Sequence, residues 1–233
     1  MSRREVQSLY LLADSQLLLW RGPSGPFLES ILKTADILAP RIAYIGASNG
    51  DSEDAHSIFA AAAAKVEGAV AHHVRASYSA EDRQFLEKAN VVVLAGGDVE
   101  AGWNTFTRTG MHDQIRDLYL DQGALIIGVS AGAVQCGTHA ALSEESGASK
   151  LVEMFGFVPY IIDVHDEKQH WERLSTTILL LEGGRSGVGI PSGGGLAAHA
   201  DGSLEPIRNS VDFFTFTEGQ LQHAVAMPPV HAS

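Results

Sequence analysis

The chain has 233 residues, of which 45% are hydrophobic and 19% are charged. This composition excludes a disordered or fibrous chain and fits a single α/β domain over residues 1–233. The 28 acidic and 16 basic residues give a formal net charge of −12, which excludes nucleic acid and anionic membranes as expected partners. No apolar stretch reaches the roughly 20 residues that a membrane-spanning helix requires.

Apolar runs alternate with helix-like segments from residue 10 to about residue 137, a pattern typical of a mostly parallel sheet with helices on both faces. The runs at 91–94 and 125–127 are continuously apolar, which predicts two central strands buried on both faces. Ser-Ala-Glu-Asp at 79–82 resembles a capping box. Strands are expected over residues 10–20, 41–46, 69–74, 90–95 and 124–129, and helices over residues 27–38, 53–67, 79–89 and 112–122.

Glycines become frequent after residue 137 and separate short apolar pieces. We expect short strands and turns here, including an antiparallel ribbon. Asp-Gly-Ser at 201–203 predicts a tight turn between apolar pieces at 196–199 and 204–207.

The strongest local signal is Gly-Val-Ser-Ala-Gly at residues 128–132, which follows one of the central apolar strands. A serine on a sharp strand-to-helix turn needs neighbours without bulk, so that its hydroxyl projects at the carboxyl end of the sheet. This pattern predicts a nucleophile elbow centred on Ser130. A turn chosen only for tight packing is the structural alternative.

A serine hydroxyl needs a base to take its proton. We select His165, because it follows the apolar piece at 161–162 where polar residues begin, and we expect it at the same sheet edge as Ser130. His72 and His73 are expected to flank a strand without a role. Possible metal ligands surround His165 in the sequence, namely Asp163, Asp166, Glu167 and His170. Their spacing matches no known zinc motif. We therefore predict neither a metal nor another cofactor.

Acyl transfer also requires N–H donors for the developing oxyanion. The N–H of Ala131, directly after the nucleophile, is one expected donor. Gly97 is the other, because Ala-Gly-Gly-Asp at 95–98 follows the neighbouring central strand and glycine allows a close approach of backbone to substrate. A plain strand-ending turn is the alternative.

The single cysteine, Cys136, excludes an internal disulfide, and residues 1–5 lead into a short apolar run that Asp14 interrupts. We therefore expect a reducing compartment, the cytoplasm, and no secretory signal. A small peptide is the expected partner, and a homodimer is compatible with the sequence.

Four motifs in order, at residues 95–98, 128–133, 163–165 and 189–193, resemble the family of aspartyl dipeptidase (peptidase E) and cyanophycinase. The resemblance spans about residues 10–207. It implies a three-layer α/β/α fold of the class I glutamine amidotransferase-like type, in which serine replaces the amidotransferase cysteine. It also implies a dipeptidase or exopeptidase that acts on short peptides with an aspartyl or related residue at the scissile bond.

Residue by residue, the resemblance makes Ser130 the nucleophile, His165 the base, and Gly97 and Ala131 the oxyanion donors. Ser192 departs from the family, whose members usually have an acid in this Gly-Ile-Pro-x-Gly stretch. A serine oxygen still accepts the second N–H of the histidine but offers no full charge. Asp163, which matches an aspartate of cyanophycinase-like members, is the alternative third member, because residues two apart on a strand face the same way.

Substrate binding is assigned to Asp98, which follows the glycine turn, and to Arg173. Dipeptidase-like members use positive side chains to hold the acidic group of the substrate, and Arg173 and Arg108 are the candidates for this. Surface arginines are the commoner alternative. The segment at 166–174 is shorter than the loop expected in the dipeptidase, so we expect a different pocket.

Two other functions stay open at this point. An α/β-hydrolase esterase also uses Gly-x-Ser-x-Gly, but its base is a late histidine such as His199 or His223. The second alternative is a binding protein, that is, a family member that has lost catalysis because serine replaces the acid at position 192. A glutamine amidotransferase needs a cysteine nucleophile, whereas Cys136 is expected in the core of the helix that follows the elbow.

Overall fold

The computed structural model describes residues 6–143 and 149–229. The helices are α1 Phe27–Thr34, α2 Glu53–Ala63, α3 Ala80–Glu87, α4 Val99–Thr109, α5 Met111–Leu120, α6 Ala131–Cys136 and α7 Glu172–Leu180, with 3-10 turns at Ser15–Leu19, Ala47–Asn49 and Glu167–Gln169. The strands are β1 Leu9–Leu12, β2 Arg21–Gly22, β3 Gly25–Pro26, β4 Arg41–Ile45, β5 Val70–Val74, β6 Val91–Leu94, β7 Leu125–Val129, β8 His139–Ser143, β9 Ser149–Glu153, β10 Ile161–Val164, β11 Gly187–Ile190, β12 Gly195–Ala198, β13 Leu204–Ile207, β14 Val211–Thr217 and β15 Gln220–Ala226.

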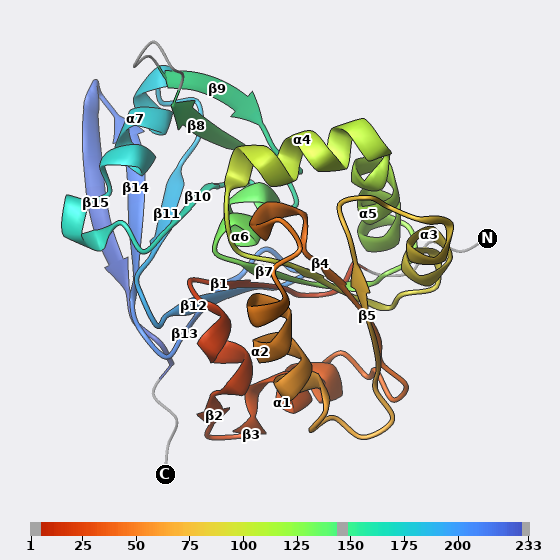
Figure 1. Ribbon diagram of the computed structural model, residues 1–233. Helices are drawn as coiled ribbons and strands as arrows, with labels where there is room; N and C mark the ends of the chain where they lie inside the picture. Colours follow the sequence, from red (N-terminus) through yellow and green to blue (C-terminus); the bar gives the residue numbers. More distant parts are fainter. Residues whose placement is uncertain (1–5, 144–148, 230–233) are drawn as a thin grey trace.

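A seven-stranded sheet in the order β13-β12-β1-β7-β6-β4-β5 forms the centre of the molecule (Figure 1). The five strands from β1 to β5 in this order are parallel, and β12 and β13 add an antiparallel edge. The expected mostly parallel sheet is confirmed, with β6 and β7 in its interior. The turn predicted at 201–203 joins β12 to β13, as expected.

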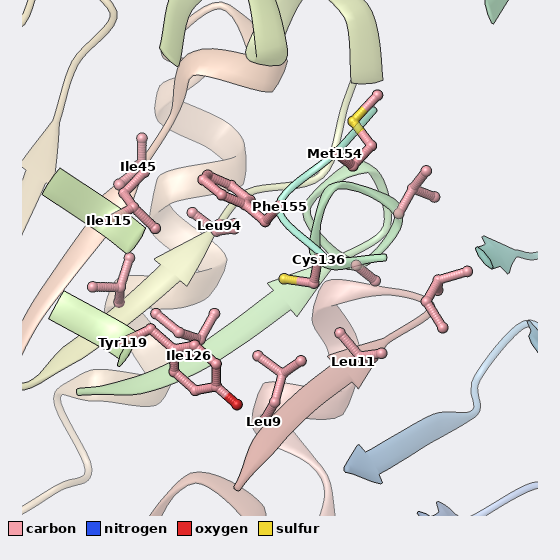
Figure 2. Close-up of a cluster of buried hydrophobic side chains, with 14 of the residues drawn as sticks. Leu9, Leu11, Ile45, Leu94, Ile115, Tyr119, Ile126, Cys136, Met154 and Phe155 are labelled. Atoms are coloured by element: carbon pink, nitrogen blue, oxygen red, sulfur yellow. The ribbon is translucent and has the colours of Figure 1, made fainter. Parts of the chain in front are cut away.

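Alternate residues of the central strands enter two separate cores. Leu11 and Ile126 belong to a core that also contains side chains of α3 to α6, whereas Leu12 and Ile127 belong to a core that contains side chains of α1 and α2. Figure 2 shows the first of these cores, where Leu11 of β1, Ile126 of β7 and Cys136 of α6 lie together. The three layers predicted from the sequence are therefore confirmed.

The first predicted strand is too long. β1 ends at Leu12, and Asp14 begins a 3-10 turn that buries Leu17 and Leu18 beneath α1 and α2. An apolar run alone does not distinguish a strand from a buried turn. The predicted helices at 27–38 and 53–67 also end earlier, at Thr34 and Ala63.

Helix α4 is absent from the sequence prediction. Gly102 lowers the helix propensity of this segment, but a side chain there would collide with Ser48, since an added Cβ would lie 2.1 Å from its Oγ. Asp98 caps the helix by accepting a hydrogen bond from the Ala101 N–H at 2.7 Å. The predicted capping box of α3 is confirmed, with Ser79 and Asp82 bonding each other's backbone N–H.

A second, four-stranded sheet in the order β10-β11-β14-β15 stands beside the central sheet (Figure 1). One face of it, including Ile162 and Val188, joins the core around α6. The other face packs Ile161 and Phe214 against Trp171 and the helix α7. The sequence predicted short strands in this region but not a separate sheet.

No helix within residues 6–143 and 149–229 is long and apolar enough to cross a bilayer. The N-terminal residues 1–5, which we used to argue against a secretory signal, lie outside the described residues.

Candidate active site

Ser130 stands on a sharp turn between β7 and α6. Its backbone has φ 48° and ψ −109°, a conformation that non-glycine residues rarely adopt. Neighbouring residues must be small here, because a Cβ added at Gly128 would lie 2.6 Å from the Gly132 carbonyl oxygen and one at Gly132 would lie 2.2 Å from the Leu94 carbonyl oxygen. The turn therefore has the geometry of a nucleophile elbow.

His165 contacts this serine, with its Nε2 2.9 Å from the Ser130 Oγ. The histidine directly follows β10, and its backbone N–H donates to the Ile190 carbonyl oxygen at 2.9 Å. The expectation that both residues lie at one sheet edge is wrong, because β10 belongs to the four-stranded sheet. The packing of the two sheets around α6 brings the hydroxyl and the imidazole together.

The glycine turn after β6 lies directly beside Ser130. Leu94 pairs with Gly128 across the sheet, and a Cβ added at Gly96 would lie 3.1 Å from the Ser130 Cβ. Gly97 has φ 135°, and a side chain there would collide with the Ser48 carbonyl oxygen, so glycine is required. Among the described residues, the N–H groups of Gly97 and Ala131 have no hydrogen-bond acceptor. Gly97, Ser130 and Ala131 line the same cavity.

The structure does not bring Asp163 to His165. The carboxylate of Asp163 is buried and binds Arg173, whose Nη2 lies 2.8 Å from its Oδ1. The argument from strand alternation fails because β10 ends at Val164 and His165 has φ 44°, outside the extended range. Burial raises the pKa of Asp163, and the ion pair with Arg173 offsets part of this effect.

Ser192 does not reach the imidazole either. It is exposed, and its backbone N–H donates to Glu167 Oε1 at 3.3 Å. In the part of the chain that the structure describes, Nδ1 of His165 has no hydrogen-bond partner. Neither proposed third member therefore contacts the base.

Glu167, which the sequence suggested only as a possible metal ligand, interacts electrostatically with His165 in the structure. One carboxylate oxygen accepts from Ser192, whereas Oε2 is buried and has no partner among the described residues. Burial tends to raise the pKa of this carboxyl, but its hydrogen bonds with Ser192 and the nearby His165 lower it below its usual value. Its position two residues after His165 was the only available signal.

Two cavities of about 370 Å³ each open onto Ser130 and His165. One contains the charged side chains of Asp98, Glu100 and Arg173. The other is lined by aromatic and aliphatic side chains of Leu18, Tyr44 and Phe59. The hydroxyl therefore has a charged space on one side and a mainly apolar space on the other.

The two predicted substrate-binding residues lie in the charged cavity. Arg173 is half exposed and uses Nε and Nη2 to bind Asp163 and the Val164 carbonyl oxygen, so its Nη1 has no partner within residues 6–143 and 149–229. Asp98 uses Oδ1 to cap α4, which leaves Oδ2 directed to no described donor.

The histidines of the esterase alternative lie away from the serine. His199 follows β12 and contacts Ser8 at 3.1 Å, near the start of β1, whereas Ser130 donates its N–H to Leu12 at the other end of this strand. His223 lies on β15 and binds Asp212. Cys136 is fully buried on α6, which confirms the expected core position, and burial raises the pKa of its thiol.

The profile of peptidase family S51 matches residues 26–203 of the chain. No curated protein matches the sequence. Among solved structures, a peptidase from an acI-B1 actinobacterium superposes with a TM-score of 0.66 at 18% identity, covering 96% of this chain and 95% of that one. A candidate peptidase E protein from Listeria monocytogenes EGD-e superposes with a TM-score of 0.62 at 14% identity, covering 87% of this chain and 98% of that one. At such identities the likeness shows a shared fold.

Proposed function

The chain belongs to peptidase family S51 and is a peptidase, and we propose that Ser130 is its nucleophile and His165 its general base. The observation that carries this proposal is the 2.9 Å contact between the Ser130 Oγ and the His165 Nε2, in a cavity that Gly97 and Ala131 also line. The backbone N–H groups of these two residues have no acceptor within residues 6–143 and 149–229. A binding protein without activity has no need for this arrangement. The pair therefore favours a working enzyme over a family member that has lost catalysis.

The proposed reaction proceeds through an acyl-enzyme. The Ser130 Oγ attacks the peptide carbonyl carbon while its proton moves to the His165 Nε2, and the N–H groups of Gly97 and Ala131 stabilise the oxyanion. The C–N bond then breaks, and His165 gives its proton to the leaving amine. Water then attacks the acyl ester while His165 takes its proton. The ester C–O bond breaks, the carboxylic acid leaves, and His165 returns the proton to the Ser130 Oγ.

We assign Glu167 as the positioning residue for His165. Its electrostatic interaction with the imidazole and its lowered pKa support an ionised carboxylate next to the base at neutral pH. An anion there stabilises the imidazolium that forms during attack, which is the role of the acid in a catalytic triad. Ser192, at the usual position of the family acid, contributes by holding Glu167 through its backbone N–H.

The proposed substrate is a short peptide with an N-terminal aspartyl residue. Such a residue carries a positive amine and a negative side chain, and the charged cavity offers the free oxygen of Asp98 and the carboxylate of Glu100 for the amine. The Nη1 of Arg173, which no described residue binds, can hold the side-chain carboxylate. The leaving residue then occupies the apolar cavity. This arrangement supports a dipeptidase or exopeptidase and not cleavage within a long chain.

The experiment compares kcat/KM of the wild-type enzyme for Asp-Leu, Asn-Leu, N-acetyl-Asp-Leu and Lys-Leu, with p-nitrophenyl acetate as an ester control. We expect Asp-Leu to exceed Asn-Leu by about 10- to 100-fold, because a charge-assisted hydrogen bond is worth about 1.5–3 kcal/mol. Acetylation should reduce hydrolysis further by removing the amine.

Equal rates for Asp-Leu and Asn-Leu, or a preference for Lys-Leu, would contradict the aspartyl specificity. Hydrolysis of the ester alone would contradict the peptidase assignment. An esterase would also depend on His199, so His199→Ala is a matched comparison for His165→Ala, and we expect only the latter to abolish hydrolysis.

A further inference from the structure

Three potential metal ligands meet at the outer edge of the central sheet, away from the residues assigned to catalysis. Glu53, His56 and His73 each offer one donor atom, and these atoms all lie within 4.8 Å of one another. β5, which carries His73, is the edge strand of the sheet (Figure 1). Two imidazoles and a carboxylate are a ligand set that divalent first-row metals accept.

The local sequence places two of these ligands on one helix face. Glu53 and His56 stand three residues apart in the first turn of α2, so their side chains are neighbours, with Glu53 Oε2 3.9 Å from His56 Nδ1. Ser52 fixes the start of the helix by accepting from the Ala55 N–H at 3.3 Å. The same Glu-x-x-His spacing positions metal ligands in helical bundles.

The burial of His73 without hydrogen-bond partners points to a ligand. Its side chain is only 6% exposed, and neither Nδ1 nor Nε2 has a hydrogen-bond partner among the described residues. A buried polar group without a partner is unfavourable by about 1–3 kcal/mol, and such groups in folded proteins require an explanation. A bound cation would satisfy one ring nitrogen.

The charges around His73 support cation binding. Asp51 Oδ1 lies 3.9 Å from His73 Nε2 and is available as a further oxygen ligand or through a water molecule. Burial lowers the pKa of both His56 and His73, so both rings are neutral near pH 7, and a coordinating imidazole must be neutral. Arg75 opposes binding, but it holds only Glu53 Oε1, at 2.6 Å.

The ligands must contract to close around an ion. Donor atoms bound tetrahedrally to Zn²⁺ lie about 3.4 Å apart, since each bond measures about 2.1 Å. The rings of His56 and His73 are stacked, with centroids 4.4 Å apart and an angle of 15° between their planes. His56 is partly exposed on the surface of α2, so rotation of its side chain directs a ring nitrogen toward the shared centre.

We propose that Glu53, His56 and His73 form a binding site for a divalent first-row metal cation, and Zn²⁺ is the probe ion for this site. The ion would join α2 to β5. The ring centroid of Tyr44 lies 5.4 Å from the centroids of both imidazole rings, and Tyr44 also lines the apolar cavity beside Ser130. The metal would therefore brace the wall of this cavity without contacting the reacting groups.

The test measures Zn²⁺ binding to the EDTA-treated full chain by isothermal titration calorimetry, with Co²⁺ absorption to report the coordination geometry. We expect one ion per chain. His56→Gln and His73→Gln should each weaken Zn²⁺ binding by about 10- to 100-fold or more. Loss of an outer-shell partner already weakens metal affinity by this amount, and each of these variants removes a direct ligand. Arg75→Gln should tighten binding, because it removes an opposing charge.

His72→Gln is the matched control. His72 neighbours His73 on β5 but faces the opposite side of the sheet, where it stacks on Phe85 and binds Asp82 at 2.8 Å. Its substitution should leave Zn²⁺ affinity unchanged. If His73→Gln does not fold, the more exposed His56→Gln still decides the question. Absence of stoichiometric binding, or equal affinity in His56→Gln and His72→Gln, would overturn the proposal.

Discussion

At the scale of single residues, the candidate site depends on backbone conformations that few side chains tolerate. Ser130 and His165 both have positive φ, at 48° and 44°. Such conformations each cost about 1–3 kcal/mol and persist only where the surrounding structure fixes them. The strand partners of β7 fix Ser130, and the hydrogen bond to Ile190 fixes His165. The surrounding strands therefore offset this strain and hold the hydroxyl and the imidazole in contact.

Glu167→Gln tests the positioning role at this scale. Removing the charge should lower kcat about 100-fold or more with little change in KM, because the carboxylate acts on the imidazolium that forms during the reaction. Steady-state kinetics on the best dipeptide measure the split, and Glu167→Asp should recover part of kcat. Glu172→Gln, an exposed glutamate at the start of α7, is the control. An unchanged kcat in Glu167→Gln would remove this residue from the account.

The sequence predicted the site only where a motif determines the local backbone. The turns at Ser130 and Gly97 were predictable because small residues mark them, and both turns follow buried strands. Glu167 was missed because it lies on an irregular 3-10 turn, where no periodicity indicates the direction of a side chain. The pairing of Asp163 with Arg173 spans ten residues and depends on how α7 packs against β10.

At the scale of elements, capping explains where several helices begin. α3 starts at a capping box in which Asp82 is buried and also binds His72 of β5. The sequence showed this cap, because its residues are adjacent along the chain. It did not show α4, since Gly102 is retained there for its close contact with Ser48. Local sequence signals therefore predict a helix that begins at a capping motif, but they miss a helix such as α4, in which a residue is retained for packing.

Asp82→Asn should destabilise the fold by about 1–2 kcal/mol at pH 7 through the loss of the cap and the His72 contact. Burial tends to raise the pKa of Asp82, but the hydrogen bonds from His72 and Ser79 lower it below the usual 3.8. Its contribution is therefore complete above this ordinary value and is lost as the pH falls through the lowered pKa. Urea unfolding of wild type and variant at several pH values measures this difference.

Glu81→Gln is the control for the capping prediction, because Glu81 is an exposed neighbour in the first turn of α3. Its substitution should leave the free energy of unfolding nearly unchanged at each pH. A gap between wild type and Asp82→Asn that stayed constant from pH 7 down to pH 2 would contradict the assigned pKa direction.

At the scale of the whole molecule, the proposed catalytic pair requires two sheets to meet. Ser130 follows β7 of the central sheet, and His165 follows β10 of the four-stranded sheet. The sequence predicted the parallel part of the central sheet, because its strands are apolar and alternate with helices. The second sheet was not predicted as a unit, since β10 pairs with β11 across the intervening helix α7, and β11 pairs with β14 beyond several glycine turns.

The most direct test of this account is a double-mutant cycle on the two residues that the sheets bring together. We would measure kcat/KM for an aspartyl dipeptide with wild type, Ser130→Ala, His165→Ala and the double variant. Each single substitution should reduce kcat/KM about 10³-fold or more. The kcat/KM of the double variant should be about equal to that of the less active single variant, because the two groups act as a unit. Retained activity in Ser130→Ala, or losses that multiply in the double variant, would contradict the account.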